Sequence, residues 1–336
     1  MADTESLACE KRCYFSIIVP MYNRAATIGR GIESILTQNF KDYEVIVVDD
    51  GSKDNSVAVV EGYLPNDSLK LIKSPENRGV CAARGLGVKN AQGHWFLFIG
   101  SDDAFKPNAL TTIYEETCNA PEEVGEVQFC YYCEAIDEIT PIPLMPEGII
   151  GFTDYLKWLE KASMSYDHNY MYCQRRKLYE LISWPEDRQY ETLYHLTVAF
   201  KTKTMMSRKV VATVYNDAQN RLTKQDTIKL SAKGKTIFHD EANSKVEILK
   251  EYGEQVKKYC PNFYERLHSY IGKSYMLCGR KAEGCRYLLR YLRMRPLSIT
   301  GWGMLTLGLF GPNAINWMKQ KCGKKIRAIG RNIGVE

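Results

Sequence analysis

The sequence lacks every feature that would set it apart from ordinary globular proteins. No segment is of low complexity, and charged residues make up 25% and hydrophobic residues 45% of the 336 residues. These proportions exclude disordered and fibrous chains, and the length suffices for one large domain or two smaller ones. Neither a G-x-x-x-x-G-K-[ST] nor a G-x-G-x-x-G motif occurs, so a P-loop kinase and a dinucleotide-binding enzyme have no support.

A disulfide framework and a secretory signal are also absent. The 11 cysteines are odd in number and have no repeating spacing, which fits the reduced thiols of a cytosolic protein better than a secreted scaffold. The one close pair, Cys130 and Cys133, lies in an apolar, aromatic run, which favours core packing over zinc binding. The N-terminal segment carries acids and no long apolar core, unlike a signal peptide. We therefore expect a cytoplasmic protein.

The excess positive charge is concentrated at the C-terminus. From Lys319 onward six basic residues face a single acid, Glu336, so the charge is a local tail and does not indicate a nucleic-acid partner. Residues 280–295 form a basic amphipathic stretch, and residues 296–318 form an uncharged run with two tryptophans. Because aromatic residues beside cations suit an anionic inner leaflet, we expect peripheral attachment at the inner face of the cytoplasmic membrane. The alternative is a helix packed on the rest of the protein.

The first third of the chain alternates between strand and helix patterns. Such an order predicts an α/β fold with a mostly parallel sheet and helices on both faces, in which ligands bind beyond the carboxyl ends of the strands. After about residue 240 the pattern is helical to the end, with one antiparallel helix pair over residues 264–292. The expected strands cover residues 15–20, 43–51, 69–74 and 94–103, the second and fourth ending in acids, and the expected helices cover residues 26–38, 54–63 and 79–91.

Two pairs of acids stand at the ends of apolar strands in this pattern. Asp49 and Asp50 follow residues 45–48, and Asp102 and Asp103 follow residues 95–99. If the strand ends converge, the carboxylates repel one another unless cations lie between them, and Mg²⁺ or Mn²⁺ with a substrate diphosphate would supply the charge. Arg78 and Arg84, between the two pairs, could contact the same phosphates. The alternative for the first pair is a simple turn with a helix cap.

These motifs resemble the N-terminal signature of glycosyltransferase family 2. The elements are P-x-Y-N-R, V-V-D-D-G-S, N-x-G-x-x-x-A-R and S-D-D, in that order, and the resemblance covers residues 15 to about 110. It implies a GT-A fold, which is Rossmann-like, together with a nucleotide-diphosphate sugar donor, a Mn²⁺ or Mg²⁺ ion and inversion at the anomeric carbon.

The resemblance also implies roles for individual residues. Asp50 would accept a hydrogen bond from a uracil-type base, Arg84 would hold base or phosphate, Asp102 would contact ribose or donor sugar, and Asp103 would ligate the metal. The expected lining of the nucleoside pocket is Pro20, Tyr22 and Arg24. Two positions depart from the family pattern: Gly100 stands where many members have an acid, and Gly85 where many have asparagine. The first departure leaves Asp103 as the main protein ligand of the metal.

An inverting transfer needs a general base near the acceptor hydroxyl. The family places an E-D pair before a helix, and two alignments compete here. The literal pair makes Asp187 the base, whereas counting back from the helix selects Glu191. Either acid could instead only cap the helix and favour its dipole. Further along, Asp217 and Arg221 are weaker candidates to close over the diphosphate.

We therefore expect a hexose or N-acetylhexosamine to pass from a UDP-sugar to a cell-surface, lipid-linked glycan acceptor. A nucleotidyltransferase and a non-catalytic glycan-binding module on the same fold stay as alternatives. The expected organisation is an N-terminal tail (1–14), a catalytic domain (15–240) and a C-terminal helical region (241–336). Within the catalytic domain, residues 15–125 would bind the nucleotide sugar and residues 126–240 the acceptor.

Overall fold

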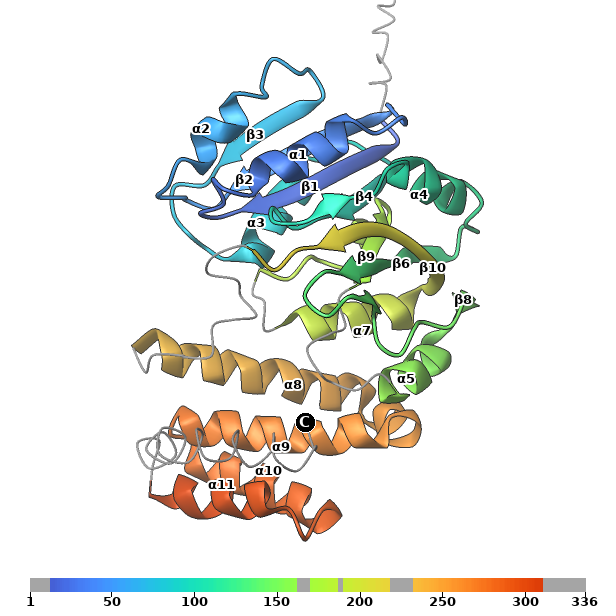
Figure 1. Cartoon of the computed structure of the whole chain (residues 1–336). Coiled ribbons are helices and arrows are strands. Elements are labelled where there is room, and N and C mark those ends of the chain that lie inside the picture. The colour runs from blue at the N-terminus through green and yellow to red at the C-terminus, as the bar shows by residue number, and fades with distance from the viewer. Residues whose placement is uncertain (1–12, 162–169, 187–189, 218–231, 311–336) are drawn as a thin grey trace, which may run out of the picture. The chain divides into compact units, whose positions relative to one another are not determined.

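The chain divides into two compact units, Met1–Lys224 and Gln225–Glu336. The computed structural model describes residues 13–161, 170–186, 190–217 and 232–310 (Figure 1). The expected boundary at residue 240 falls inside helix α8 (Ala232–Tyr259), which belongs entirely to the second unit.

The first unit is built on a ten-stranded sheet with the order β3-β2-β1-β4-β9-β6-β10-β5. Its first four strands are parallel: β3 (Leu69–Lys73), β2 (Tyr43–Asp49), β1 (Phe15–Met21) and β4 (Trp95–Phe98). The connections run through α1 (Ile28–Leu36), α2 (Ser56–Glu61) and α3 (Val80–Asn90). The α/β fold and its alternating first third are therefore confirmed.

The rest of the sheet mixes directions. β9 (Tyr170–Arg175) lies antiparallel between β4 and β6 (Val124–Cys133), while β10 (Lys203–Val214) runs parallel to β6. Shorter strands complete the edges: β5 (Ala104–Phe105) and β8 (Gly148–Ile150) on β10, and β7 (Glu138–Thr140) on β6. The remaining helices of this unit are α4 (Ala109–Cys118), α5 (Phe152–Lys161), α6 (Leu178–Leu181) and α7 (Glu191–Lys201).

Both faces of the parallel half are buried, which explains its continuous apolar runs. Alternate residues point to opposite faces, so Ile17 and Val19 of β1 join one core cluster and Ile18 joins another. The first cluster includes residues of α1, α2 and α4, and the second includes residues of α3 with Trp184. The helices on both faces hold the strand ends in place at the edge where the acids lie.

The second unit contains α8, α9 (Pro261–Leu277), α10 (Lys281–Met294) and α11 (Ile299–Leu309). The α9–α10 pair predicted from the sequence approaches closely at Gly272, where an added Cβ would lie 2.7 Å from Leu288. The α9–α10 pair is not isolated, because Phe238 of α8 and Met304 of α11 share one apolar cluster with it. Within the described ranges, no helix is long and apolar enough to cross a membrane.

Candidate functional site

The ends of three neighbouring strands meet at one edge of the sheet. β1 lies between β2 and β4, and the Asp50 amide donates to the Met21 carbonyl at 2.8 Å. On the other side of β1, the Arg24 Nε atom lies 3.8 Å from an Asp102 carboxylate oxygen. The two acid pairs are therefore two strand spacings apart, about 10 Å. The convergence predicted from the sequence is present.

The two acids of the first pair accept hydrogen bonds from different parts of the chain. The Asp49 carboxylate accepts from the Ser52 amide at 3.2 Å, which is turn chemistry. The Asp50 carboxylate, in a residue only 3% exposed, accepts from the Arg78 and Gly79 amides at 2.9 and 2.8 Å through different oxygens. A carboxylate has about four acceptor positions, so Asp50 keeps capacity for a ligand. Burial, the largest influence, raises the Asp50 pKa, and the two amides offset it only partly.

Asp102, the first acid of the second pair, is held by two arginines. Besides the contact with Arg24, the Asp102 carbonyl accepts from Arg30 at 2.6 Å. Arg30 also donates to both Asp217 carboxylate oxygens, at 2.6 and 3.0 Å, and its guanidinium lies 3.8 Å from the centre of the Tyr215 ring. Arg30 was missed in the sequence because α1 gave only an apolar pattern. Arg221 lies outside the described residues.

Asp103 lies folded back over Gly100. A Cβ at residue 100 would be 2.6 Å from an Asp103 carboxylate oxygen and 3.0 Å from one of Asp102. The missing side chain therefore gives the two carboxylates their room. The Tyr131 hydroxyl of β6 belongs to the same surroundings, because its pKa is raised by burial first and then by the Asp103 charge.

The donor set for a metal ion is small. No group of three or more His, Cys, Asp or Glu side chains able to hold an ion occurs in the described parts of the chain. Mg²⁺ and its relatives commonly bind through one or two carboxylates plus substrate phosphates, and Asp102 and Asp103 fit that mode. Cys130 and Cys133 are buried free thiols on β6, as core packing predicts.

An ion pair joins the two halves of the first unit. Arg84 of α3 donates to Glu191, the first residue of α7, at 2.7 Å, with side chains 19% and 28% exposed. The expected base- or phosphate-binding residue, Arg84, and the candidate general base, Glu191, are therefore in contact. The other base candidate, Asp187, lies outside the described residues.

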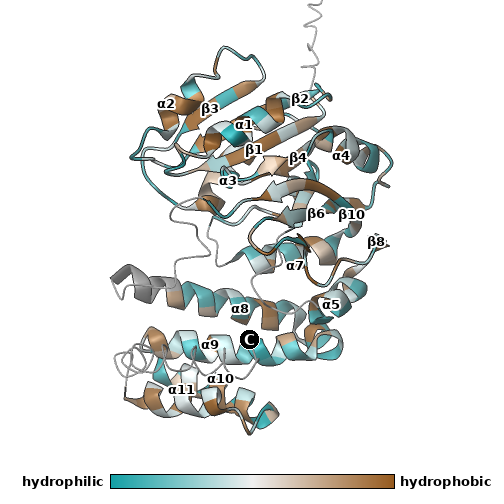
Figure 2. Ribbon diagram, in the orientation of Figure 1, coloured by the Kyte–Doolittle hydropathy of each residue, from teal (hydrophilic) through white to brown (hydrophobic). Residues whose placement is uncertain are grey.

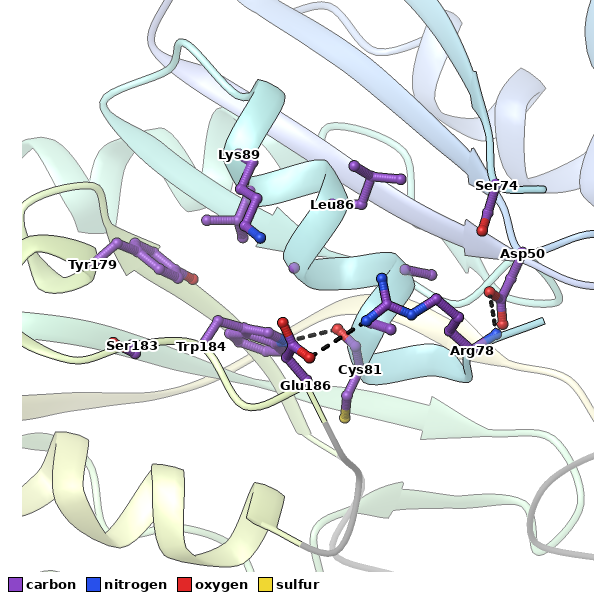
Figure 3. Close-up of a pocket in the computed structure, with 14 residues that line it drawn as sticks. Asp50, Ser74, Arg78, Cys81, Leu86, Lys89, Tyr179, Ser183, Trp184 and Glu186 are labelled. Carbon is purple, nitrogen blue, oxygen red and sulfur yellow. Dashed lines mark hydrogen bonds and ion pairs between the residues drawn. The ribbon is translucent and has the colours of Figure 1, made fainter. Parts of the chain in front are cut away.

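A pocket of about 420 Å³ opens along α3 (Figure 3). Trp184 stacks on Phe98 with ring centres 5.0 Å apart, and its indole N–H donates to the Cys81 carbonyl at 2.9 Å. An added Cβ at Gly85 would lie 3.1 Å from the Trp184 ring, so the indole occupies the space that a family asparagine would need. Of the candidate site residues named from the sequence, Asp50 and Arg78 line this pocket.

The mouth of the pocket is crossed by an ion pair. Figure 3 shows the Arg78 side chain extending from beside Asp50 toward Glu186, and the two charged groups are 3.3 Å apart. Near the same edge, Pro20 is buried in β1, and Tyr22, just past its end, is 40% exposed. An exposed ring at a strand end suits stacking on a base, and that role for Tyr22 stays a prediction.

The family model described as glycosyl transferase family 2 matches residues 16–214. The chain belongs to this family. Among curated relatives, the minor teichoic acid biosynthesis protein GgaA of Bacillus subtilis is 40% identical over 125 residues, 35% of this chain and 28% of GgaA. Glycosyltransferase GlyG of Streptococcus pneumoniae is 34% identical over 121 residues, 36% of this chain and 40% of GlyG.

The sequence matches cover only part of the curated relatives, whereas the structural matches cover most of both chains. The chain spans only 36 to 40% of the length of the first curated relatives. The crystal structure of S. aureus TarS 1–349 in complex with UDP-GlcNAc has a TM-score of 0.60 at 18% identity, covering 87% of this chain and 88% of that one. The mannosyltransferase PcManGT of Pyrobaculum calidifontis, in complex with GDP-Man and Mn²⁺, has a TM-score of 0.53 at 16% identity, covering 97% and 89%. Both support the GT-A fold.

Proposed function

We propose that the chain transfers a hexose or N-acetylhexosamine from a UDP-sugar to a lipid-linked cell-surface glycan, with inversion at the anomeric carbon. The observation that carries this is the meeting of Asp50, Asp102 and Asp103 at the edge formed by β1, β2 and β4 in a member of glycosyl transferase family 2. The UDP-GlcNAc of the TarS complex and the teichoic acid role in the name of GgaA support the donor and acceptor classes.

The donor nucleoside would lie over the ends of β1 and β2. Tyr22 offers an exposed ring for stacking, and the Asp50 carboxylate offers an acceptor to the imide N–H of uracil. Pro20 and Arg24 complete the lining. Cytosine presents no N–H at that ring position, so Asp50 favours uracil over cytosine.

The diphosphate would lie over the end of β4. Asp103, with Asp102 beside it, would hold Mn²⁺ or Mg²⁺, which when bound neutralises the charge of the departing diphosphate. The guanidinium of Arg24 and that of Arg30 lie at the same strand end and add fixed positive charge. Both groups are already held in place by hydrogen bonds, so little reorganisation is needed when the charge develops.

Glu191 or Asp187 would accept the proton of the acceptor hydroxyl. The acceptor oxygen then bonds to the anomeric carbon from the side opposite the diphosphate, and the carbon–oxygen bond to UDP breaks with its electrons leaving on UDP. The Arg84 guanidinium, 2.7 Å away, holds the Glu191 carboxylate in place at the start of α7. A lipid-linked acceptor would bring this reaction to the inner face of the cytoplasmic membrane.

The test is UDP release from a panel of UDP-hexoses and UDP-N-acetylhexosamines with Mn²⁺. We expect one sugar to be turned over, and Asp187→Asn or Glu191→Gln to lower turnover by about 10² to 10⁴-fold while sparing UDP binding. Glu180→Gln, an exposed acid on α6, is the matched control and keeps full turnover. UDP binding without any turnover across the panel would instead identify a non-catalytic module.

A further inference from the structure

The second unit carries an exposed apolar row on a helix without charge. α11 has no Asp, Glu, Lys or Arg, and appears as brown and pale segments in Figure 2. Ile299, Trp302 and Leu309 are 87%, 49% and 55% exposed, and the flanking Leu297 and Phe310 are 92% and 82% exposed. Five large apolar side chains on one short element form an unusual surface for a soluble helix bundle.

A row of arginines lies on the neighbouring helix α10. Arg286, Arg290 and Arg293 are all exposed and recur at helical spacing on one face. In the described part of the chain none of them forms an ion pair, whereas Arg280 is paired with Glu283 at 2.6 Å. The row is therefore a positively charged surface, which Glu283 offsets in part beside Arg286.

Both rows point away from the apolar cluster that α9, α10 and α11 share. Leu288 of α10 and Met304 of α11 point into the cluster shared with Met276 of α9. At 100° per residue, Trp302 lies about 200° from Met304, and Arg290 lies about 200° from Leu288. Each row therefore points away from that cluster, and since α10 and α11 pack against each other, both rows lie on the outer surface of one helix pair.

We infer that this outer face of α10 and α11 binds an anionic lipid surface. Apolar side chains that enter the headgroup region, flanked by cations that meet anionic lipids, are the composition of an interfacial helix face. Charge argues against two other occupants. The C-terminal tail has six basic residues and one acid from Lys319 onward, and a second copy would bring another arginine row against this one. Lipid binding is independent of sugar transfer, so each can fail alone.

Flotation of the full chain with liposomes tests the assignment. We expect flotation with vesicles containing 30% phosphatidylglycerol and none with phosphatidylcholine alone. Charge reversal at Arg286, Arg290 and Arg293 together should weaken partitioning at least about 100-fold, at roughly fivefold for each cation lost. Replacing Ile299 and Leu309 with serine should also abolish flotation, because the apolar row supplies the insertion.

Matched controls keep the result decisive. Lys257→Glu with Lys258→Glu changes exposed charges on α8 and should leave flotation unchanged; circular dichroism confirms that every variant is folded. The inference is overturned if the arginine variant floats like the wild type, or if only neutralising the tail cations from Lys319 onward abolishes flotation. An equal loss of flotation in the α8 control would also overturn it. So would a dimer, detected by sedimentation, that the arginine or apolar variants dissociate while their lipid binding stays unchanged.

Discussion

Substitution of Asp50 by asparagine removes one of the two oxygens that hold the loop before α3. The Arg78 and Gly79 amides donate to separate oxygens at 2.9 and 2.8 Å, in a residue 3% exposed. Asparagine keeps one oxygen and turns an NH₂ group toward the other amide. Losing a charge-assisted bond and leaving a buried donor unsatisfied should cost about 3 kcal/mol. For a domain of this size that corresponds to a fall in Tm of about 10 °C.

Thermal melting with and without UDP measures both consequences. We expect the lower Tm together with UDP affinity reduced at least tenfold, since the base loses a charged acceptor. The control is Glu61→Gln, an acid 46% exposed and paired with Lys73 at the surface, which should change stability by less than about 0.5 kcal/mol. If Asp50→Asn melts within 2 °C of the wild type, Asp50 does not hold the loop.

The raised pKa of Asp50 adds a pH signature to the same variant. On acidification the carboxylate gains its proton above the usual aspartate range, so UDP affinity should fall there in the wild type and stay flat in Asp50→Asn. Stability has the opposite sign, because a raised folded pKa binds the proton more tightly than the unfolded chain does, and protonation then favours folding. Calorimetric titration of UDP across mildly acidic pH measures the first effect.

Two further substitutions test the packing around the site. His195→Leu should destabilise the first unit by about 1 kcal/mol in urea unfolding, because Glu126 loses an imidazole 3.6 Å away but keeps the Gln128 and Gln174 amides at 2.6 and 2.5 Å; a loss of about 3 kcal/mol or more contradicts this. Gly85→Asn should lower the free energy of unfolding by about 2 kcal/mol, because the asparagine displaces Trp184. The double variant with Trp184→Ala should lose less stability than the sum of the two single losses. Additive losses would show that the Trp184 ring and the side chain at residue 85 do not compete for space.

The sequence predicted the parallel half of the fold because each strand and helix there has its own local pattern. The acids at the ends of β2 and β4 could be placed together for the same reason, since parallel strand ends share an edge. β9 was missed, because only pairing with β4 and β6 makes Tyr170–Arg175 a strand. The apolar, aromatic run that holds Cys130 and Cys133 is β6, which pairs antiparallel with β7.

Contacts between distant segments could not be predicted from local patterns. The Arg84–Glu191 pair joins residues 107 positions apart, and the Arg30–Asp217 pair joins residues 187 positions apart. Gly85 appeared as a departure from the family pattern, but it complements Trp184, which lies nearly 100 residues later. A fit between residues so far apart in the sequence can be recognised only once their positions in space are known.

In the proposed function, Asp103 and the substrate diphosphate would share one Mn²⁺ or Mg²⁺ ion at the end of β4. Titrating UDP into the protein with and without Mn²⁺ measures this coupling. Mn²⁺ should tighten UDP binding at least tenfold in the wild type, and Asp103→Asn should reduce that coupling below about twofold while leaving metal-free UDP affinity unchanged. Full coupling in Asp103→Asn, or no effect of Mn²⁺ on the wild type, would rule out a shared ion held by Asp103.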